Sequence, residues 1–307
     1  MPASLKAIRK RISSVKSTLK ITKAMKMVAG ARLNRAQQRI VSLRPYAIKT
    51  QEILQSVADS LRQSGEGDVQ SGGGHDLHPL LAERPEKNVL FLLMTADRGL
   101  CGGFNTNVSK ATFQAWQAKI SESEASVRFA TAGRKGREYL QRRGGEIVQD
   151  FPRMYDGLDL DKSRTVSSWL VSRFHKGEFD AVYIAYNEFK SPITQKPTIE
   201  KLLPLPKPPA IDDDKARETA KSELLFEPTP KALLERLVPM YVEISIFRAL
   251  LETQAGFFGA QMTAMDSATR NAKDAIDRFT LLYNRARQAA ITKELMEIIG
   301  GAEALKE

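Results

Sequence analysis

The chain has 307 residues, 42% hydrophobic and 27% charged, so it is long enough to bury a real core in one or two domains. It has no run near the roughly 18 apolar residues of a membrane span, and its start lacks the apolar region of a secretion signal. The single cysteine, Cys101, excludes an intrachain disulfide and fits a reducing compartment.

The excess of positive charge, +11 in all, lies at the start of the chain. Beyond residue 51, 34 Lys and Arg residues face 36 Asp and Glu residues, a balance of −2. Such a field indicates an anionic partner: nucleic acid, a membrane surface or an acidic protein surface. A mitochondrial transit peptide is also basic, but the helical period here continues far beyond a cleavable presequence. Thirteen basic residues precede the first acid, Glu52: Lys6, Arg9, Lys10, Arg11, Lys16, Lys20, Lys23, Lys26, Arg32, Arg35, Arg39, Arg44 and Lys49.

The first 62 residues predict one long helix. Small or apolar residues recur in alternating steps of three and four, which is the pattern of a coiled-coil seam. The register slips near Met25 and then resumes, and Pro45 is expected to kink or split the helix. The seam comprises Leu5, Ile8, Ile12, Val15, Leu19 and Thr22, then Ala36, Ile40, Leu43, Ala47, Thr50, Leu54, Val57 and Leu61.

Between the chain ends, short apolar runs alternate with helical stretches. The runs at 88–96, 126–133, 145–151 and 179–189 predict strands, and helices are expected near 105–120, 134–143 and 161–176. This order indicates an α/β domain with a mainly parallel sheet, to which 191–205 adds a further strand, expected at an edge. We place this Rossmann-like domain at 87–203, followed by an exposed, proline-rich connection at 204–230.

A glycine-rich turn, "ADRGLCGGFNTNV" at 96–108, follows the first predicted strand. A strand, a glycine turn and a helix can bind phosphate. The spacing of Gly99, Gly102 and Gly103 matches neither GxGxxG nor GxxxxGK(S/T), and the turn itself has no lysine to reach a phosphate. No histidine is visibly paired with Cys101 as a base, and the HxxH spacing of His75 and His78 falls in a loop. We therefore favour a packing turn, with no catalytic, cofactor or metal site.

The segment 231–307 predicts a second long helix, ending in a cap at Gly300 and Gly301. A stripe inside a helical bundle would show the same pattern. Two such seams at opposite ends of one chain instead favour an antiparallel coiled coil of the two terminal helices. Its seam comprises Leu237, Tyr241, Ile244, Arg248, Leu251, Ala255, Phe258, Met262, Met265, Thr269, Ala272, Ile276, Phe279, Tyr283, Ala286 and Ala290.

Three stretches, "ITKAMKMVAGARL", "DRGLCGGFNTNV" and "LLYNRARQAAITKELMEIIGGA", resemble the signatures of the gamma subunit of the F-type ATP synthase, bacterial type. The resemblance covers essentially the whole chain. It implies a non-catalytic central rotor shaft that turns inside a ring of alpha and beta subunits. It further implies contacts with the epsilon subunit and the membrane ring of c subunits, on the cytoplasmic face of a bacterial inner membrane. Nucleic acid is the rival partner, but no aromatic residue precedes Tyr46 to stack on bases.

The resemblance also implies partner-binding residues. Met25 and Lys26 lie in the first signature, with Met25 expected near Gln288, Thr292 and Glu294. Arg287 and Gln288 match a pair that hydrogen-bonds a catalytic subunit.

In the same family, Glu227 matches a residue that touches the c ring, with Phe226 beside it where relatives can carry tyrosine. Phe257 and Gln261 stand where Glu and Arg are common in the family, so the chain departs from the family pattern at this turn of the helix, which the resemblance links to coupling.

Overall fold

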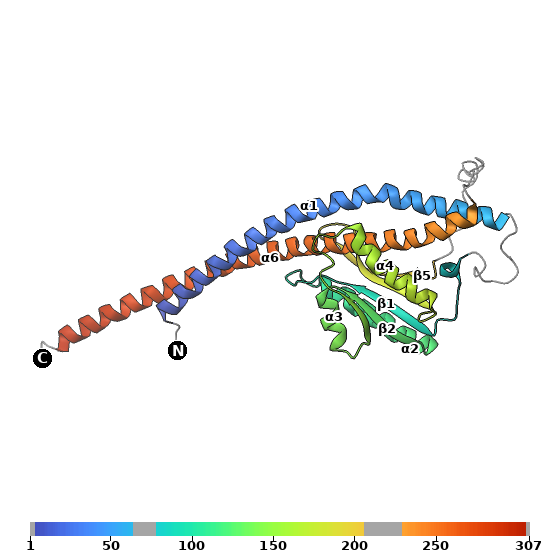
Figure 1. The fold of residues 1–307 in the computed structure, drawn as a ribbon. Helices are drawn as coiled ribbons and strands as arrows, with labels where there is room; N and C mark the ends of the chain where they lie inside the picture. Colours follow the sequence, from blue (N-terminus) through green and yellow to red (C-terminus); the bar gives the residue numbers. More distant parts are fainter. Residues whose placement is uncertain (1–3, 64–77, 206–228, 305–307) are drawn as a thin grey trace. The chain divides into compact units, whose positions relative to one another are not determined.

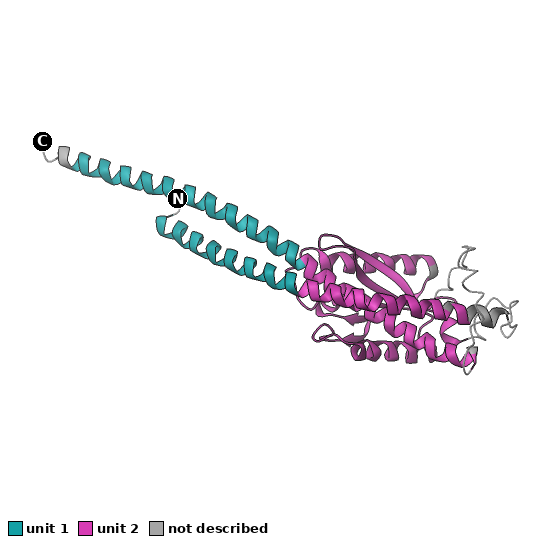
Figure 2. Cartoon of the chain, turned by 90° about the horizontal axis from the view of Figure 1, so that it is seen from above, with its two compact units in different colours: residues 1–31, 261–307 teal, residues 32–260 magenta. Residues whose placement is uncertain are grey.

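The structure, a computed structural model, describes residues 4–63, 78–205 and 229–304. Its contacts divide the chain into two compact units, coloured separately in Figure 2. Unit 1 comprises Met1–Ala31 and Gln261–Glu307, and unit 2 comprises Arg32–Ala260. The long helices α1 (Leu5–Gln63) and α6 (Pro230–Ala304) each contribute to both units.

Unit 2 contains a five-stranded sheet with the order β3-β2-β1-β4-β5 (Figure 1). The first four strands are parallel, and β5 runs antiparallel to β4 at the edge. All five strands were predicted, as were the mainly parallel sheet and the edge position of the last strand. The strands are β1 (Asn88–Met94), β2 (Ser126–Ala132), β3 (Ile147–Phe151), β4 (Ala181–Phe189) and β5 (Gln195–Leu203).

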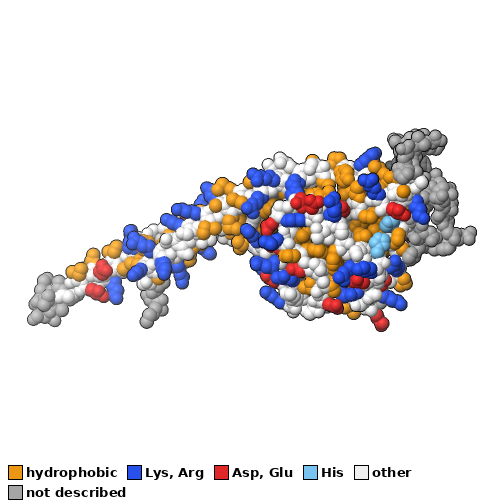
Figure 3. All heavy atoms as spheres, viewed as in Figure 1, with side chains coloured by type: hydrophobic (Ala, Val, Ile, Leu, Met, Phe, Trp, Pro, Cys, Tyr) orange, Lys and Arg blue, Asp and Glu red, His pale blue; other side chains and the backbone are white. Residues whose placement is uncertain are grey.

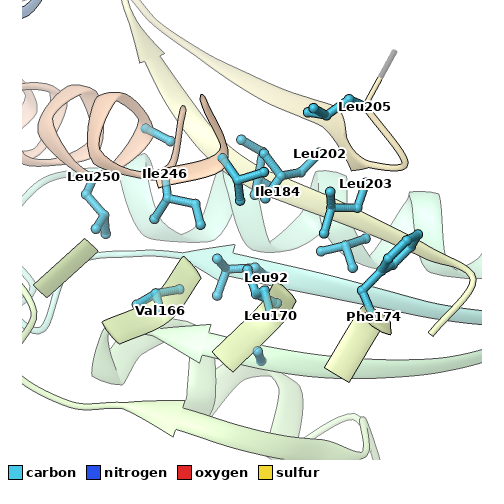
Figure 4. Packing of buried hydrophobic residues seen from close by; sticks show 14 of the residues in the cluster. Leu92, Val166, Leu170, Phe174, Ile184, Leu202, Leu203, Leu205, Ile246 and Leu250 are labelled. Carbon is cyan, nitrogen blue, oxygen red and sulfur yellow. The ribbon is translucent and has the colours of Figure 1, made fainter. Parts of the chain in front are cut away.

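Helices cover both faces of this sheet, which explains why β1 is apolar and buried from Val89 to Met94. Its side chains alternate, so that Phe91 faces α2 and α3 whereas Leu92 faces α4 and the unit 2 part of α6. Figure 4 shows Leu92 among residues of α4 and α6. The helices are α2 (Phe104–Ser123), α3 (Arg134–Gln141) and α4 (Leu160–His175), with a short 3-10 helix at Pro79–Leu81.

The predicted seams are confirmed as the less exposed stripes of α1 and α6. Each predicted seam residue of α1 from Leu5 to Val57 is buried or half-buried, as is each of α6 from Leu237 to Ala290. Leu61 lies in α1, but its side chain is outside the described residues. Burial of one stripe per helix is what holds long helices together in water, because their own hydrogen bonds contribute little net stability.

The predicted split at Pro45 and the predicted cap at Gly300 and Gly301 are wrong, whereas the predicted kink at Pro45 stays a prediction. Helix α1 continues through Pro45, and α6 continues past Gly300 and Gly301 to Ala304. Packed residues such as Leu43 and Thr50 lie on both sides of Pro45, and their burial outweighs the roughly 3 kcal/mol that an interior proline costs. A helical glycine costs only about 1 kcal/mol relative to alanine, and the sequence that follows, "AEA", favours helix.

The predicted exposed connection begins later than expected. Pro204 and Leu205 are buried, and the Leu205 N–H donates to the Leu80 carbonyl at 3.0 Å. Leu205 belongs to the hydrophobic core, so the chain is still buried at residue 204 and the predicted exposed connection does not begin there. Most of the connection lies outside the described residues. The other predicted boundaries, 1–62, 87–203 and 231–307, stay predictions.

Candidate functional site

In unit 1, α1 and α6 form an antiparallel pair whose register is set by polar contacts. The Thr22 and Thr269 hydroxyls lie 2.9 Å apart between the helices. One turn further along α1, the Lys26 ammonium pairs with the Asp266 carboxylate, which also lies 3.4 Å from Arg270. Since Lys26 follows Thr22 and Asp266 precedes Thr269, the two chains run in opposite directions.

The pair is packed through a mixture of small and larger apolar residues. Ala29 is fully buried, Ile8 is 2% exposed, and Met265 and Ala272 are also buried. A Cβ added to Gly30 would lie 3.4 Å from the Met262 sulfur, an ordinary contact. Small side chains let two helices approach closely, and the half-buried Met25 belongs to the same interface.

The outward face of α1 in unit 1 is basic. Seven exposed Lys and Arg residues form this face. Within the described part of the chain, none of the seven forms an ion pair with a carboxylate. Figure 3 shows Lys and Arg side chains spread along this helix pair. Unpaired charges of one sign create a field that attracts an anionic partner. The seven exposed residues, here called the basic face, are Lys6, Arg9, Lys10, Arg11, Lys16, Lys20 and Lys23.

The end of α6 presents predicted partner residues to solvent. Arg287, Gln288, Thr292 and Glu294 are all exposed. Apolar side chains accompany them on the same turns, among them Ile291 at 54% and Met296 at 63% exposure. Such a mixture of accessible charged and apolar groups is typical of a surface that a partner covers.

The predicted proximity of Met25 to Gln288, Thr292 and Glu294 is wrong. The Lys26–Asp266 pair places Met25 near residue 266, because these helices are antiparallel. Gln288 lies nineteen residues past Thr269, roughly 28 Å along α6 at about 1.5 Å per residue. Lys26 is engaged by Asp266, and Phe226 and Glu227 lie outside the described residues.

The glycine-rich turn in unit 2 is closed by its own side chains. The Asn105 amide accepts a bond from Ala96 N at 2.9 Å and donates to the Arg98 carbonyl at 3.1 Å and to Cys101 Sγ at 3.3 Å. Cys101 is 3% exposed and packs with Ala96 and Phe104. Burial raises the pKa of the thiol, which disfavours a reactive thiolate. The predicted packing role of Cys101 is confirmed.

The second glycine cluster, "AGRKG", is also a packing feature. Gly133 has a φ of 111°, and a Cβ there would lie 1.8 Å from the Thr95 carbonyl oxygen. At Gly136 the backbone N–H donates to Thr95 Oγ1 at 2.7 Å. Only glycine allows α3 to begin this close to β1.

Of the two histidines with HxxH spacing, only His78 is described, and it has a structural role. His78 Nδ1 accepts the Leu80 N–H at 3.1 Å and caps the 3-10 helix, and His75 lies outside the described residues. Over the residues whose placement is described, no group of three or more His, Cys, Asp or Glu side chains could hold a metal ion.

Comparison with known proteins identifies the family. The family model described as ATP synthase matches residues 4–305. The ATP synthase gamma chain of Sorangium cellulosum is 53% identical, covering 99% of both chains. The chain belongs to the ATP synthase gamma chain family. The gamma chains of Anaeromyxobacter sp. and Pelotomaculum thermopropionicum are 45% and 43% identical, again over 99% of both chains.

Solved structures share the gamma-chain fold at lower identity. A chain of the Euglena gracilis mitochondrial ATP synthase, OSCP/F1/c-ring, in rotational state 3 matches with a TM-score of 0.63 and 18% identity, covering 98% of this chain and 94% of that one. A chain of the Tetrahymena thermophila mitochondrial ATP synthase central stalk and c-ring matches with a TM-score of 0.59 and 22% identity, covering 81% and 99%. These confirm the predicted fold class.

Sequence reasoning missed the polar contacts that set the helix register in this gamma-family chain. A signal was available, because Thr22 and Thr269 are polar residues at seam positions of two otherwise small or apolar stripes. It also missed what Phe257 does. Its ring lies 6.3 Å from that of Phe104, so this position makes an aromatic contact where the family resemblance led us to expect a glutamate.

Proposed function

We propose that this chain is the central rotor shaft of a bacterial ATP synthase and is not itself catalytic. It couples ion flow through the membrane to ATP synthesis by turning inside the ring of alpha and beta subunits. Its full-length similarity to gamma chains supports this role. The observation that carries the proposal is the basic face, which has no acidic partner in the described chain and lies on a tightly packed antiparallel helix pair.

The basic face can hold the shaft in place by weak electrostatic attraction while still allowing it to turn. Exposed ion pairs contribute about 0–1 kcal/mol each and are screened over roughly 8 Å at physiological salt. The family resemblance implies that the catalytic subunits present acidic loops at three positions around the shaft. Weak attraction that is similar at all three positions guides the shaft without trapping it at one of them.

The remaining contacts follow from the family. We assign Met25, Lys26, Arg287, Gln288, Thr292 and Glu294 to the catalytic ring, and Phe226 and Glu227 to the c ring. The epsilon subunit is the further partner, with no nucleic acid, cofactor or metal. In the described part of the chain, no helix is long and apolar enough to cross a membrane. We place the protein on the cytoplasmic face of the inner membrane, held there by its partners.

Direct observation of rotation tests this proposal. In the assembled complex, Cys101→Ala removes the native thiol and Lys110→Cys, at an exposed position of α2, receives a bead while the catalytic ring is fixed to a surface. We expect ATP-dependent rotation in one direction with three stops per turn. A bead that stays still while the same complexes hydrolyse ATP would refute the rotor role. Recovery of the chain with DNA or RNA at low salt, and not with an ATPase, would favour nucleic-acid binding.

A further inference from the structure

The loops at the carboxyl ends of β1, β3 and β4 meet the same short stretch of α6 inside unit 2. We call this stretch, residues 253–260, the collar. The hairpin that joins β4 to β5 lies against Gly259, where a Cβ would be 3.1 Å from both the Cα and the carbonyl oxygen of Pro192. The Gln195 amide stiffens this hairpin by donating to the carbonyls of Ser191 at 3.0 Å and Pro192 at 2.9 Å.

The glycine-rich turn after β1 meets the collar one turn earlier. A Cβ on Gly256 would lie 2.8 Å from Cε2 of Phe104, closer than side chains pack. The Phe104 ring also meets the Phe257 ring edge to face, and Phe257 and Ala260 pack against the cluster that contains Cys101. Asn187 of β4 donates to the Phe104 carbonyl at 3.3 Å, which ties the turn to the neighbouring strand.

The segment after β3 provides the third contact. Gln254 Nε2 donates to the Tyr155 carbonyl at 3.1 Å. Arg39 of α1 donates to the Leu158 carbonyl in the same segment. Side chains of α1 and α6 thus both donate to backbone carbonyls of the loop after β3. The collar is therefore contacted by the three loops that follow β1, β3 and β4, and the sheet holds these loops in fixed positions relative to one another.

We propose that the collar is where torque passes between the α/β domain and α6, and that Gly256 and Gly259 are the positioning residues that make this grip close. This rests on the rotor function proposed above and adds the place of torque transfer. A grip made through backbone and aromatic ring atoms resists twisting, because close-packed interiors are hardly compressible, whereas long side chains would yield. A methyl group at Gly256 would lie 2.8 Å from the Phe104 ring and one at Gly259 would lie 3.1 Å from the Pro192 backbone, so either substitution must shift the atoms that face it.

The test uses the whole ATP synthase in inverted membrane vesicles, with ATP hydrolysis and ATP-driven ion uptake measured on the same preparation. Gly259→Ala should lower the ions taken up per ATP hydrolysed by about half or more, since its methyl group meets backbone that cannot swing away. Gly256→Ala should act likewise, and adding Phe104→Leu should restore the ratio by removing the ring atoms that clash. Gly301→Ala is the matched control, because a Cβ there meets nothing within 4 Å.

A purely structural role would lower assembly of the complex and leave the ratio of uptake to hydrolysis unchanged in the complexes that remain. An unchanged ratio in assembled Gly259→Ala complexes overturns the proposal for the collar alone. The rotation experiment above decides the rotor function separately.

A cross-link covers the case in which the glycine variants do not assemble. Ala260→Cys adds a second thiol to the cluster that holds Cys101. If the collar stays closed throughout the cycle, the oxidised complex, with a disulfide between residues 101 and 260, should have the same coupled activity as the reduced complex. Inhibition by oxidation that a thiol reductant reverses would show that the grip opens, and would overturn the proposal.

Discussion

The hydroxyl groups of Thr22 and Thr269 lie 2.9 Å apart across the helix pair of unit 1. Each hydroxyl also lies close to a carbonyl of its own helix, Leu19 for Thr22 and Met265 for Thr269. A polar pair at a coiled-coil seam favours one register over others that would leave its groups unpaired in the interface.

We expect Thr22→Val and Thr269→Val each to destabilise the isolated chain by about 1 kcal/mol, the usual net value of one hydrogen bond. The double variant should cost less than the sum, because the first substitution already removes the shared bond. Urea unfolding followed by circular dichroism gives the cycle, with Thr18→Val, at an exposed position of α1, as control. Strict additivity would mean that the two hydroxyls do not interact.

Sequence periodicity identifies the buried face of each helix but not the pairing of Thr22 with Thr269. The steps of three and four correctly predicted which side of each helix is buried, because burial depends on local periodicity. Register depends on contacts between residues 240 or more positions apart, and a heptad pattern is nearly unchanged by a shift of seven. The proximity of Met25 to Gln288, taken from the family, was therefore wrong, while Thr22–Thr269 and Lys26–Asp266 show the actual pairing.

The α/β domain was predicted more completely. Its strands are short apolar runs bounded by turns, so their positions follow from composition. The collar could not be predicted in the same way. A glycine in a helix has no sequence signal for what approaches it, and the approach of Pro192 to Gly259 depends on how the hairpin packs.

A second prediction concerns Glu86. Burial alone would raise the pKa of this carboxyl, but bonds from Lys119, Lys201 and Tyr183 outweigh it and lower the pKa from 4.5 to about 2. Because the folded pKa is depressed, the stabilisation is present above pH 4.5 and is lost as the pH falls towards 2. The Glu86→Gln variant should therefore be less stable than the wild type near neutral pH, and the difference should shrink below pH 4.5.

Thermal unfolding of both proteins at a series of pH values checks this. Glu122→Gln, at an exposed position of α2, is the control for loss of one carboxylate. A stability difference between Glu86→Gln and the wild type that stays constant down to the acid limit would show that ionisation of Glu86 is not its source.

A third prediction is that the isolated chain does not bind ATP measurably. The glycine-rich turn uses Asn105 to bond Ala96 N and the Arg98 carbonyl, and Phe104 packs against the collar. No lysine of the turn can reach a phosphate. Isothermal titration calorimetry with Mg-ATP should show no heat beyond dilution. Binding at one site per chain would contradict the purely mechanical role of this domain.

A fourth prediction is that Cys101→Ala leaves coupled ATP synthesis nearly unchanged. The Sγ atom accepts a hydrogen bond from Asn105, which keeps its bonds to Ala96 and Arg98 when the sulfur is removed. Burial also raises the pKa of the thiol, so a maleimide should modify the folded chain far more slowly than the urea-unfolded chain. Loss of most synthesis in a fully assembled Cys101→Ala complex would assign this thiol a role beyond packing.

The last prediction concerns Arg287 and Gln288, which are exposed on α6 and which we assign to the catalytic ring. A guanidinium can hold a carboxylate through two parallel hydrogen bonds, whereas alanine offers none. In a partly desolvated contact, loss of the charged bond costs about 1.5–3 kcal/mol, or roughly tenfold to a hundredfold where that contact limits the rate. Arg287→Ala with Gln288→Ala should therefore slow steady-state ATP hydrolysis by the assembled complex.

The matched control is Asn284→Ala with Arg285→Ala, which also removes one amide and one guanidinium group from exposed positions of α6, about one turn earlier. It should slow hydrolysis much less, because only the Arg287 and Gln288 pair is assigned to the grip. The subunit composition of each preparation shows whether the complex is whole, so a fall caused by missing subunits is recognised. Unchanged turnover in the whole Arg287 and Gln288 double variant would mean that the two side chains are merely solvated at the helix surface.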